Sequence, residues 1–346
     1  MIADGQIRAE MDRFLEFLER DGIRYERDVP LSRKTWIRRG GTASIWLQPS
    51  ELSEFVRGVA WLQGSGLPFE VVGGTSNCFF SRDYDPPVVV STLRLKGLRI
   101  EGGNLVCECG YRMSELARWS VENGYEGFEG FIGLPGTAAG AAINNAGCYG
   151  SLVSDVVAGI DLLENGEIRR VLPQEIGYSH RNSRLKSKEM SGVVVSVVFK
   201  LRASQDRDAL RRRMEHAQWH RRTFQEHSFP NLGTVFCHLR WKPLPVVRRV
   251  GMALAERWLR LREKDPVKLV KARRNLFLRL VGAGELERYV SEFGFNCFLW
   301  KDEGADEAFG KYVEFVHRKT DSATMEIELK NGKRSGHGGR DEGSSA

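Results

Sequence analysis

The sequence predicts an α+β fold in which helices and strands follow one another irregularly. Residues 51–66 carry apolar side chains at helical spacing, which favours an amphipathic helix. Residues 67–77 then change from a β-rich run to a glycine turn, so a strand is expected to lead into that turn. Residues 88–110 are typical of successive short strands, and residues 112–124 of a helix that ends at Gly124.

The remaining chain is mixed at first and then becomes strongly basic. Residues 156–172 predict a hairpin around an Asn-Gly turn. From about residue 206 the composition becomes arginine-rich and helical, so we divide the chain into residues 1–205 and a second domain, residues 206–330. Residues 331–346 are polar and glycine-rich without an apolar anchor, and we expect this tail to be disordered.

Composition favours a folded globular protein with a sizeable core. The chain has 346 residues, of which 41% are hydrophobic. Its longest apolar stretches, such as residues 192–199, are far shorter than the roughly 18 residues that cross a bilayer, and the first residues have no apolar signal core. We therefore expect a cytoplasmic protein with no membrane partner. Six cysteines without CxxC spacing or histidine partners predict reduced thiols and no metal.

The formal net charge of +7 raises the question of a nucleic-acid partner. The basic residues concentrate in helix-like runs, and no recognised nucleic-acid motif accompanies them. We therefore expect no nucleic acid. Two interpretations stay open for these runs: a solvated amphipathic face, which we favour for most of the arginines, or an electropositive funnel for a nucleotide diphosphate or a phosphorylated nicotinamide cofactor.

Residues 124–150 (GYEGFEGFIGLPGTAAGAAINNAGCYG) are the most informative stretch of the chain. So many small residues beside paired asparagines indicate a backbone shaped around a ligand. Glycine permits close approaches that a Cβ would forbid, and Pro135 fixes φ immediately before Gly136. This pattern predicts a binding surface on which main-chain N–H groups face a large cofactor.

A second glycine-rich turn lies about sixty residues earlier. Residues 73–77 (GGTSN) offer consecutive main-chain donors and three polar side chains, which suit a diphosphate. A plain tight turn would look the same. The two segments together favour a two-loop cradle for a dinucleotide, although neither is a GxGxxG fingerprint.

Five stretches resemble the UDP-N-acetylenolpyruvoylglucosamine reductase family in the same order along the chain. They are TWIRRGGTA (35–43), VVGGTSNCFF (71–80), YSHRNSRLK (178–186), PNLGTVF (230–236) and MEIEL (325–329), together with the glycine-rich segment 124–150. Residues 240–295 match the family poorly. The resemblance implies a two-subdomain FAD-binding module of the PCMH/VAO type, followed by a smaller α+β substrate-binding domain whose final strand returns to the flavin.

The resemblance also implies the cofactors and the residues that hold them. FAD would be bound non-covalently within residues 1–205, and NADPH would reduce it. The cofactor-binding residues carried over by the motifs are Gly73, Gly74, Thr75, Ser76, Asn77, Gly133, Pro135, Gly136, Thr137, Gly140, Asn144, Asn145 and Gly147.

Three catalytic residues follow from the same motifs. Arg181 matches the active-site arginine, Thr234 stands where the family has a proton-donating serine, and Glu328 matches the catalytic glutamate. Glu326 and Glu328 alternate with apolar residues, so on one strand they would share a face, with Glu326 as an outward neighbour or a supporting group. An edge strand facing solvent would show the same alternation.

The chain departs from the family beside these residues. His180 stands where tyrosine is common, and Cys237 and His238 replace the usual lysine and asparagine. The resemblance implies NADPH-dependent, FAD-mediated reduction of UDP-N-acetylglucosamine enolpyruvate to UDP-N-acetylmuramate, a peptidoglycan precursor, by a monomer that binds a nucleotide sugar. The departures leave open a related FAD oxidoreductase with a different acceptor. A catalytically silent flavin-binding protein is disfavoured because Arg181, Thr234 and Glu328 are all present.

Overall fold

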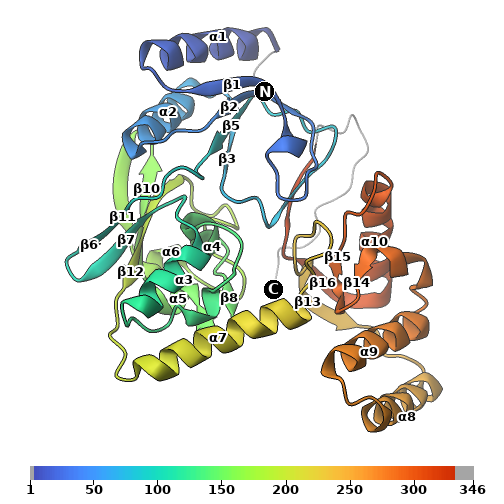
Figure 1. Ribbon diagram of the computed structural model, residues 1–346. Helices are drawn as coiled ribbons and strands as arrows, with labels where there is room; N and C mark the ends of the chain where they lie inside the picture. Colours follow the sequence, from blue (N-terminus) through green and yellow to red (C-terminus); the bar gives the residue numbers. More distant parts are fainter. Residues whose placement is uncertain (1–3, 332–346) are drawn as a thin grey trace.

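The computed structural model describes residues 4–331, and the chain forms two lobes (Figure 1). The first lobe, blue to green in the figure, contains two large sheets with helices around them. The second lobe, orange to red, packs around its own core. The yellow helix α7 runs beneath the first lobe toward the second. The predicted disordered tail falls almost wholly outside the described residues.

The first sheet lies at the N-terminal end of the first lobe. Its strand order is β1 (Tyr25–Pro30), β2 (Thr42–Leu47), β5 (Val88–Ser91), β3 (Phe69–Val72). β1 is antiparallel to β2, whereas β2, β5 and β3 are parallel. The expected helix at residues 51–66 is confirmed as α2 (Leu52–Ser65), which begins with a capping box and ends at Gly66 in the left-handed conformation. α1 (Asp4–Arg20) lies beside α2, and the tilted rings of Phe14 and Trp61 have their centroids 4.8 Å apart.

The second sheet is wholly antiparallel. Its order is β11 (Glu167–Val171), β10 (Val157–Glu164), β12 (Val193–Lys200), β7 (Asn104–Glu108), β6 (Leu98–Glu101). The predicted hairpin is confirmed: Asn165 and Gly166 both have positive φ, as a tight hairpin turn requires. The expected helix at residues 112–124 is α3 (Met113–Glu122), and Gly124 follows it with φ 79°.

Short elements complete the first lobe. They are η1 (Leu31–Arg33), β4 (Cys78–Phe80), η2 (Glu129–Phe131), α4 (Ala138–Ile143), β8 (Gly147–Cys148), β9 (Ser151–Leu152), α5 (Val153–Val156) and α6 (Pro173–Ile176). α4 is almost entirely alanine and glycine, which lets it pack closely against β7 and β12. The sheet therefore carries the glycine-rich segment directly on its surface.

α7 (Arg207–Phe224) begins at Asp206, whose side chain caps it by accepting from the Ala209 N–H. Its buried Ala217 packs into the core of the first lobe. The division of the chain at residue 206 stays a prediction, and the helix that follows it still packs against the core of the first lobe.

The second lobe is built around aromatic side chains. Its elements are β13 (Phe236–Trp241), α8 (Val246–Arg262), α9 (Pro266–Val281), η3 (Gly284–Tyr289), β14 (Val290–Ser291), β15 (Gly294–Phe298), α10 (Ala305–Lys319) and β16 (Thr320–Met325). β13 and β16 form one antiparallel pair, and β14 and β15 form another. The ring of Phe298 lies 5.4 Å from that of the fully buried Tyr312. Arg274 is also buried and donates to the carbonyls of Ser291 and Val290.

The last strand returns the chain to the first lobe. β17 (Glu328–Lys330) pairs in parallel with β4, with Glu328 opposite Cys78. The prediction of one continuous strand through residues 325–329 is wrong, because β16 ends at Met325 and β17 begins at Glu328. Ile327 is buried in the core of the second lobe, and this anchor breaks the strand between the two glutamates. Across residues 4–331, none of the helices combines the length and the apolar character that a membrane span needs.

Candidate active site

The two glycine-rich loops lie against each other. A Cβ on Gly74 would stand 3.2 Å from the Gly136 Cα, closer than most real contacts. The Ser76 hydroxyl donates to the Pro135 carbonyl at 3.1 Å, and the Asn77 amide donates to Asn144 Oδ1 at 3.3 Å. The segments that the sequence paired as one cradle are therefore adjacent in space.

The first loop presents main-chain donors that the protein itself does not use. Within residues 4–331, the N–H groups of residues 74–77 donate no hydrogen bond to another protein group. Thr75 has φ 52°, a left-handed conformation that turns successive N–H groups toward one side. The Thr75 hydroxyl accepts from the Trp36 N–H at 2.8 Å, which fixes this turn. Consecutive unpaired donors fit the negatively charged diphosphate of FAD.

Several predicted cofactor residues shape the second loop. Thr137 caps the N-terminus of α4 and accepts from the Gly140 N–H at 3.4 Å. Gly133 and Gly136 have φ values of 70° and 119°, which disfavour any side chain. A Cβ on Gly147 would lie 2.8 Å from Leu152 Cδ1, so the Leu152 side chain would have to move to accept one. These residues set the path of the backbone around the site.

The paired asparagines have different surroundings. Asn145 is buried, and its side chain donates to the Ser179 carbonyl at 2.8 Å and accepts from the Ser154 N–H at 3.1 Å. Both ends of its amide are therefore used inside the protein, where one holds the arginine motif and the other holds α5. Asn144 lies at the end of α4 and connects that helix to the first loop through Asn77.

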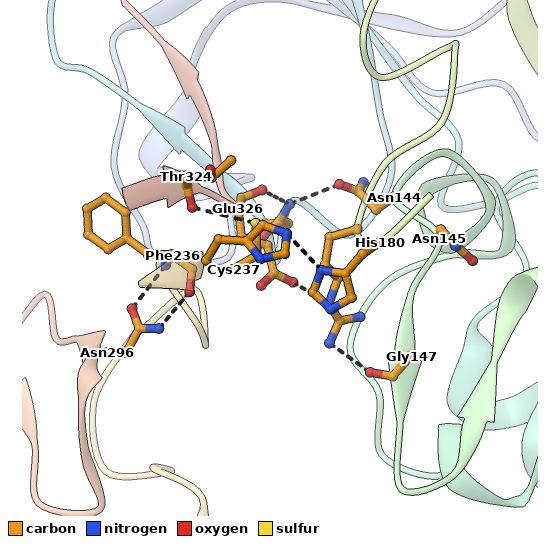
Figure 2. Close-up of polar contacts among 12 residues, drawn as sticks. Asn144, Asn145, Gly147, His180, Phe236, Cys237, Asn296, Thr324 and Glu326 are labelled. Carbon is orange, nitrogen blue, oxygen red and sulfur yellow. Dashed lines mark hydrogen bonds and ion pairs between the residues drawn. The ribbon is translucent and has the colours of Figure 1, made fainter. Parts of the chain in front are cut away.

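Arg181 and Glu326 form the charged centre of the site, and Figure 2 labels Glu326 and Gly147 on the two sides of this centre. The Arg181 Nε lies 3.2 Å from a Glu326 carboxylate oxygen, and its Nη2 donates to the Gly147 carbonyl at 2.8 Å. Lys186 Nζ donates to the main-chain carbonyls of Arg181 at 3.0 Å and of Glu326 at 3.2 Å. Asn77 donates to the same Glu326 carbonyl at 3.1 Å. Glu326, expected to be an outward neighbour or a supporting group, is the ion-pair partner of the predicted active-site arginine.

Glu328 lies on the other side of the strand break. Its N–H donates to the Asn77 carbonyl at 2.8 Å, and β17 holds it beside Cys78. Burial, and then the nearby Glu328 carboxylate, raise the pKa of the Cys78 thiol far above its usual range. Among the described residues, Arg181 has Glu326 and not Glu328 as its ion-pair partner. The structure thus brings Arg181 and Glu326 into contact. Glu328 is linked to this pair through Asn77, which hydrogen-bonds the main chain of both glutamates.

Thr234 is exposed in the loop before β13. The next residue, Val235, accepts from the Glu326 N–H at 2.8 Å through its carbonyl, so Thr234 lies beside the charged centre. Asn296 fixes the start of β13, because its side chain both donates to the Phe236 carbonyl at 2.7 Å and accepts from the Phe236 N–H at 3.0 Å. No motif in the sequence marks Asn296.

The three departures from the family meet at this centre. His180 Nδ1 lies 3.1 Å from His238 Nε2, so a hydrogen bond joins the arginine motif to β13 (Figure 2). Burial, and then the negative charge of Glu326, raise the pKa of the Cys237 thiol, whereas Lys186 and Arg181 oppose this effect. All of these groups therefore surround one site between the two lobes.

The motif at residues 35–43 links the lobes. Trp36 Nε1 donates to the Asn231 carbonyl at 2.8 Å, and Arg39 Nη2 donates to the Asp302 carbonyl at 2.6 Å. Arg39 also lies 3.4 Å from the Asp306 carboxylate. The sequence identified this motif only by resemblance. The structure shows that it positions the second lobe beside the two glycine-rich loops, residues 73–77 and 133–147, which we call the FAD-side loops.

This fold and its two-loop cradle define an FAD-binding protein. Residues 43–172 match the family model described as "FAD binding domain". Two curated relatives are UDP-N-acetylenolpyruvoylglucosamine reductases. That of Synechococcus sp. (strain JA-3-3Ab) is 30% identical over 232 residues, which cover 66% of this chain and 74% of the relative. That of Caldicellulosiruptor saccharolyticus is 29% identical over 227 residues, 65% of this chain and 72% of the relative. The chain belongs to the UDP-N-acetylenolpyruvoylglucosamine reductase family.

A solved structure supports the fold over most of the chain. The crystal structure of UDP-N-acetylenolpyruvylglucosamine reductase from Thermus caldophilus superimposes with a TM-score of 0.62 at 20% identity, covering 89% of this chain and 99% of that one. The predicted fold class, a PCMH/VAO-type module followed by a second α+β domain, is confirmed. The prediction of FAD as the cofactor is confirmed as well.

Proposed function

We propose that this chain reduces the enolpyruvyl group of UDP-N-acetylenolpyruvoylglucosamine to give UDP-N-acetylmuramate, using FAD and NADPH. The observation that carries the proposal is the Arg181–Glu326 centre, which stands between the FAD-side loops and the second lobe. Family membership supplies the reaction class. We expect a cytoplasmic monomer that binds a nucleotide sugar.

The FAD-side loops would hold the cofactor. The N–H groups of residues 74–77 would bind its diphosphate, and the close contact of Gly74 with Gly136 would keep the two loops together around it. Bound FAD supplies hydride transfer, which no side chain of the protein can perform.

Arg181 would bind the substrate carboxylate. Its guanidinium is already oriented by the Gly147 carbonyl, and a planar, permanently charged group pairs well with a carboxylate. During reduction negative charge develops toward that carboxylate, so a fixed cation stabilises the transition state more than the ground state. Glu326 limits the freedom of Arg181 before substrate binds.

Thr234 would deliver the proton. Its side chain is exposed and makes no hydrogen bond within the described residues, so its hydroxyl is free to reach a ligand. Glu328, which the family motif assigns as the catalytic glutamate, would act as an acidic group near the substrate, and its N–H is held by the Asn77 carbonyl. Proton donation by positioned side chains of this kind typically contributes about 10²–10⁴-fold to a rate.

Flavin absorbance in a stopped-flow spectrometer tests the proposal. The purified protein, reduced anaerobically with NADPH, is mixed with UDP-N-acetylenolpyruvoylglucosamine. Rapid reoxidation of the flavin, with UDP-N-acetylmuramate as the product, is the expected result. Reduction by NADPH without reoxidation by this substrate would reject the proposed reaction while leaving the flavoprotein assignment intact.

A related FAD oxidoreductase with another acceptor is the second candidate. It is favoured by one specific observation: His180, Cys237 and His238 replace family residues and all lie at the charged centre. In the same experiment this candidate predicts that the reduced flavin reacts with a different enoyl or carbonyl acceptor. Failure of every acceptor to reoxidise the flavin would favour a catalytically silent flavin-binding protein.

A further inference from the structure

Helix α8 carries an exposed apolar stripe along its whole length. Helical spacing of three, four, four and three residues places five apolar side chains on one face. None of the residues of α8 is buried. The stripe consists of Val247, Val250, Leu254, Trp258 and Leu261, whose exposed fractions are 83%, 54%, 64%, 54% and 67%.

The opposite face of α8 already has a partner. Met252, Ala255 and Leu259 are partly covered on the side that faces α9. Arg248 donates to the Leu280 carbonyl at 3.3 Å, and Glu256 forms an ion pair with Arg273. These contacts fix the rotation of α8 on α9. The apolar stripe therefore points away from the second lobe, and Figure 1 shows α8 at the outer corner of the molecule, beyond α9.

The positive charge of the protein is concentrated on this helical hairpin. Residues 246–281 contain eleven basic and three acidic residues, which is a formal charge of +8, whereas the rest of the chain carries −1. Arg257 and Arg262 flank the stripe on its two sides, and the Arg262 guanidinium lies 4.9 Å above the Trp258 ring. The solvated basic face expected from the sequence is therefore combined with an apolar face that nothing in the described chain covers.

We propose that α8 and α9 dock this lobe on an anionic phospholipid surface. An amphipathic helix with tryptophan and leucine on one side and arginine around them lies in the plane of a membrane interface, where its apolar face enters the acyl boundary. The arginines meet the negative lipid headgroups. This proposal replaces the expectation of no membrane partner with binding at the membrane surface, which requires no membrane-spanning helix.

Charge and shape favour an anionic lipid surface over two other occupants, a second copy of the chain and a folded acidic partner. A second copy of the chain would bring two surfaces of the same strong positive charge together, which repel. A folded acidic partner would need a groove that takes the whole apolar row of α8 and carries acidic residues on both sides, whereas an anionic lipid surface offers both features without a specific shape. A planar, fluid and anionic surface matches both the charge and the exposed row of side chains.

Vesicle co-sedimentation of the full chain with bound FAD tests the proposal. The wild type should sediment with vesicles that contain phosphatidylglycerol, and binding to pure phosphatidylcholine vesicles should be much weaker. The variant Leu254→Glu with Trp258→Glu should lose at least about tenfold in apparent affinity. The matched control Ile168→Glu, which changes a 50% exposed aliphatic residue on β11 in the first lobe, should bind like the wild type.

A second variant tests the contribution of positive charge separately from that of the apolar stripe. Arg257→Gln with Arg262→Gln leaves the stripe intact and should weaken binding to anionic vesicles, an effect that high salt should reproduce in the wild type. Circular dichroism checks that each variant is folded. No sedimentation of the wild type with anionic vesicles would overturn the proposal. Equal binding by the wild type and the Glu variant would also overturn it, as would a wild-type dimer in light scattering that the Glu variant abolishes.

Discussion

Arg181 forms its ion pair with Glu326, 3.2 Å away, although the family motif assigns catalysis to Glu328. The two glutamates lie on opposite sides of the buried Ile327, and only Glu326 contacts the arginine. We expect Glu328→Gln to slow flavin reoxidation by about 10²-fold or more at saturating substrate while flavin reduction by NADPH stays normal. Single-turnover absorbance measures the two half-reactions separately.

Glu326→Gln is the matched variant for this assignment. The amide keeps the size of the side chain but loses the ion pair to Arg181, so the guanidinium is less firmly oriented. We expect KM for the nucleotide sugar to change by about tenfold, with near-normal reoxidation at saturation. The opposite pattern, in which Glu326→Gln abolishes reoxidation and Glu328→Gln spares it, would transfer the catalytic role to Glu326.

Thr234 provides a test of the proton donor. Thr234→Val keeps the branched shape and removes the hydroxyl, so reoxidation should fall by about 10²-fold with little effect on reduction by NADPH. Thr234→Ser restores the residue found in the family and should retain or increase the rate. Equal loss of both half-reactions in Thr234→Val would instead indicate damage to the flavin site.

Local elements could be predicted because their signals are local. The helix at residues 51–66 has a strict apolar period and a capping box, and the hairpin at Asn165 and Gly166 needs only residues that accept positive φ. The pairing of the two glycine-rich loops was also predictable, since small residues beside asparagines recur in both segments. Each of these inferences depends on a few neighbouring residues.

The relationships across the two lobes could not be predicted in the same way. Glu326 and Glu328 alternate as in any strand, and the break appears only because Ile327 enters the core of the second lobe. Asn296 fixes β13 from sixty residues away without a motif. An apolar stripe such as that of α8 looks the same in a sequence whether a partner covers it or not.

The contact between the glycine-rich loops predicts a specific effect on FAD binding. A Cβ on Gly73 would lie 2.5 Å from Thr137 Oγ1, so Gly73→Ala must displace the residue that caps α4. We expect the FAD dissociation constant to rise by about tenfold, which corresponds to about 1.4 kcal/mol. Quenching of FAD fluorescence on titration of the apoprotein measures it.

Gly64 provides the control for that substitution. A Cβ on Gly64 meets no atom within 4 Å, and the residue lies in α2. Gly64→Ala should therefore leave FAD affinity unchanged and stabilise the protein by up to about 1 kcal/mol. Unchanged FAD affinity in Gly73→Ala would show that the loop contact does not hold the cofactor site.

Cys297 predicts part of the pH dependence of stability. Burial, and then the nearby Glu226, raise the pKa of its thiol to about 12, whereas an unfolded cysteine has a pKa near 8.5. The stabilisation is fully present below about pH 8.5. Between that pH and about 12 the unfolded chain releases a proton that the folded chain keeps, so the free energy of unfolding falls by up to about 1.4 kcal/mol per pH unit. Cys297→Ala should remove this contribution to the slope of the free energy of unfolding against pH between pH 9 and 11. Urea titrations under reducing conditions measure that free energy. An unchanged slope would show that the thiol ionises as readily in the folded protein as in the unfolded chain.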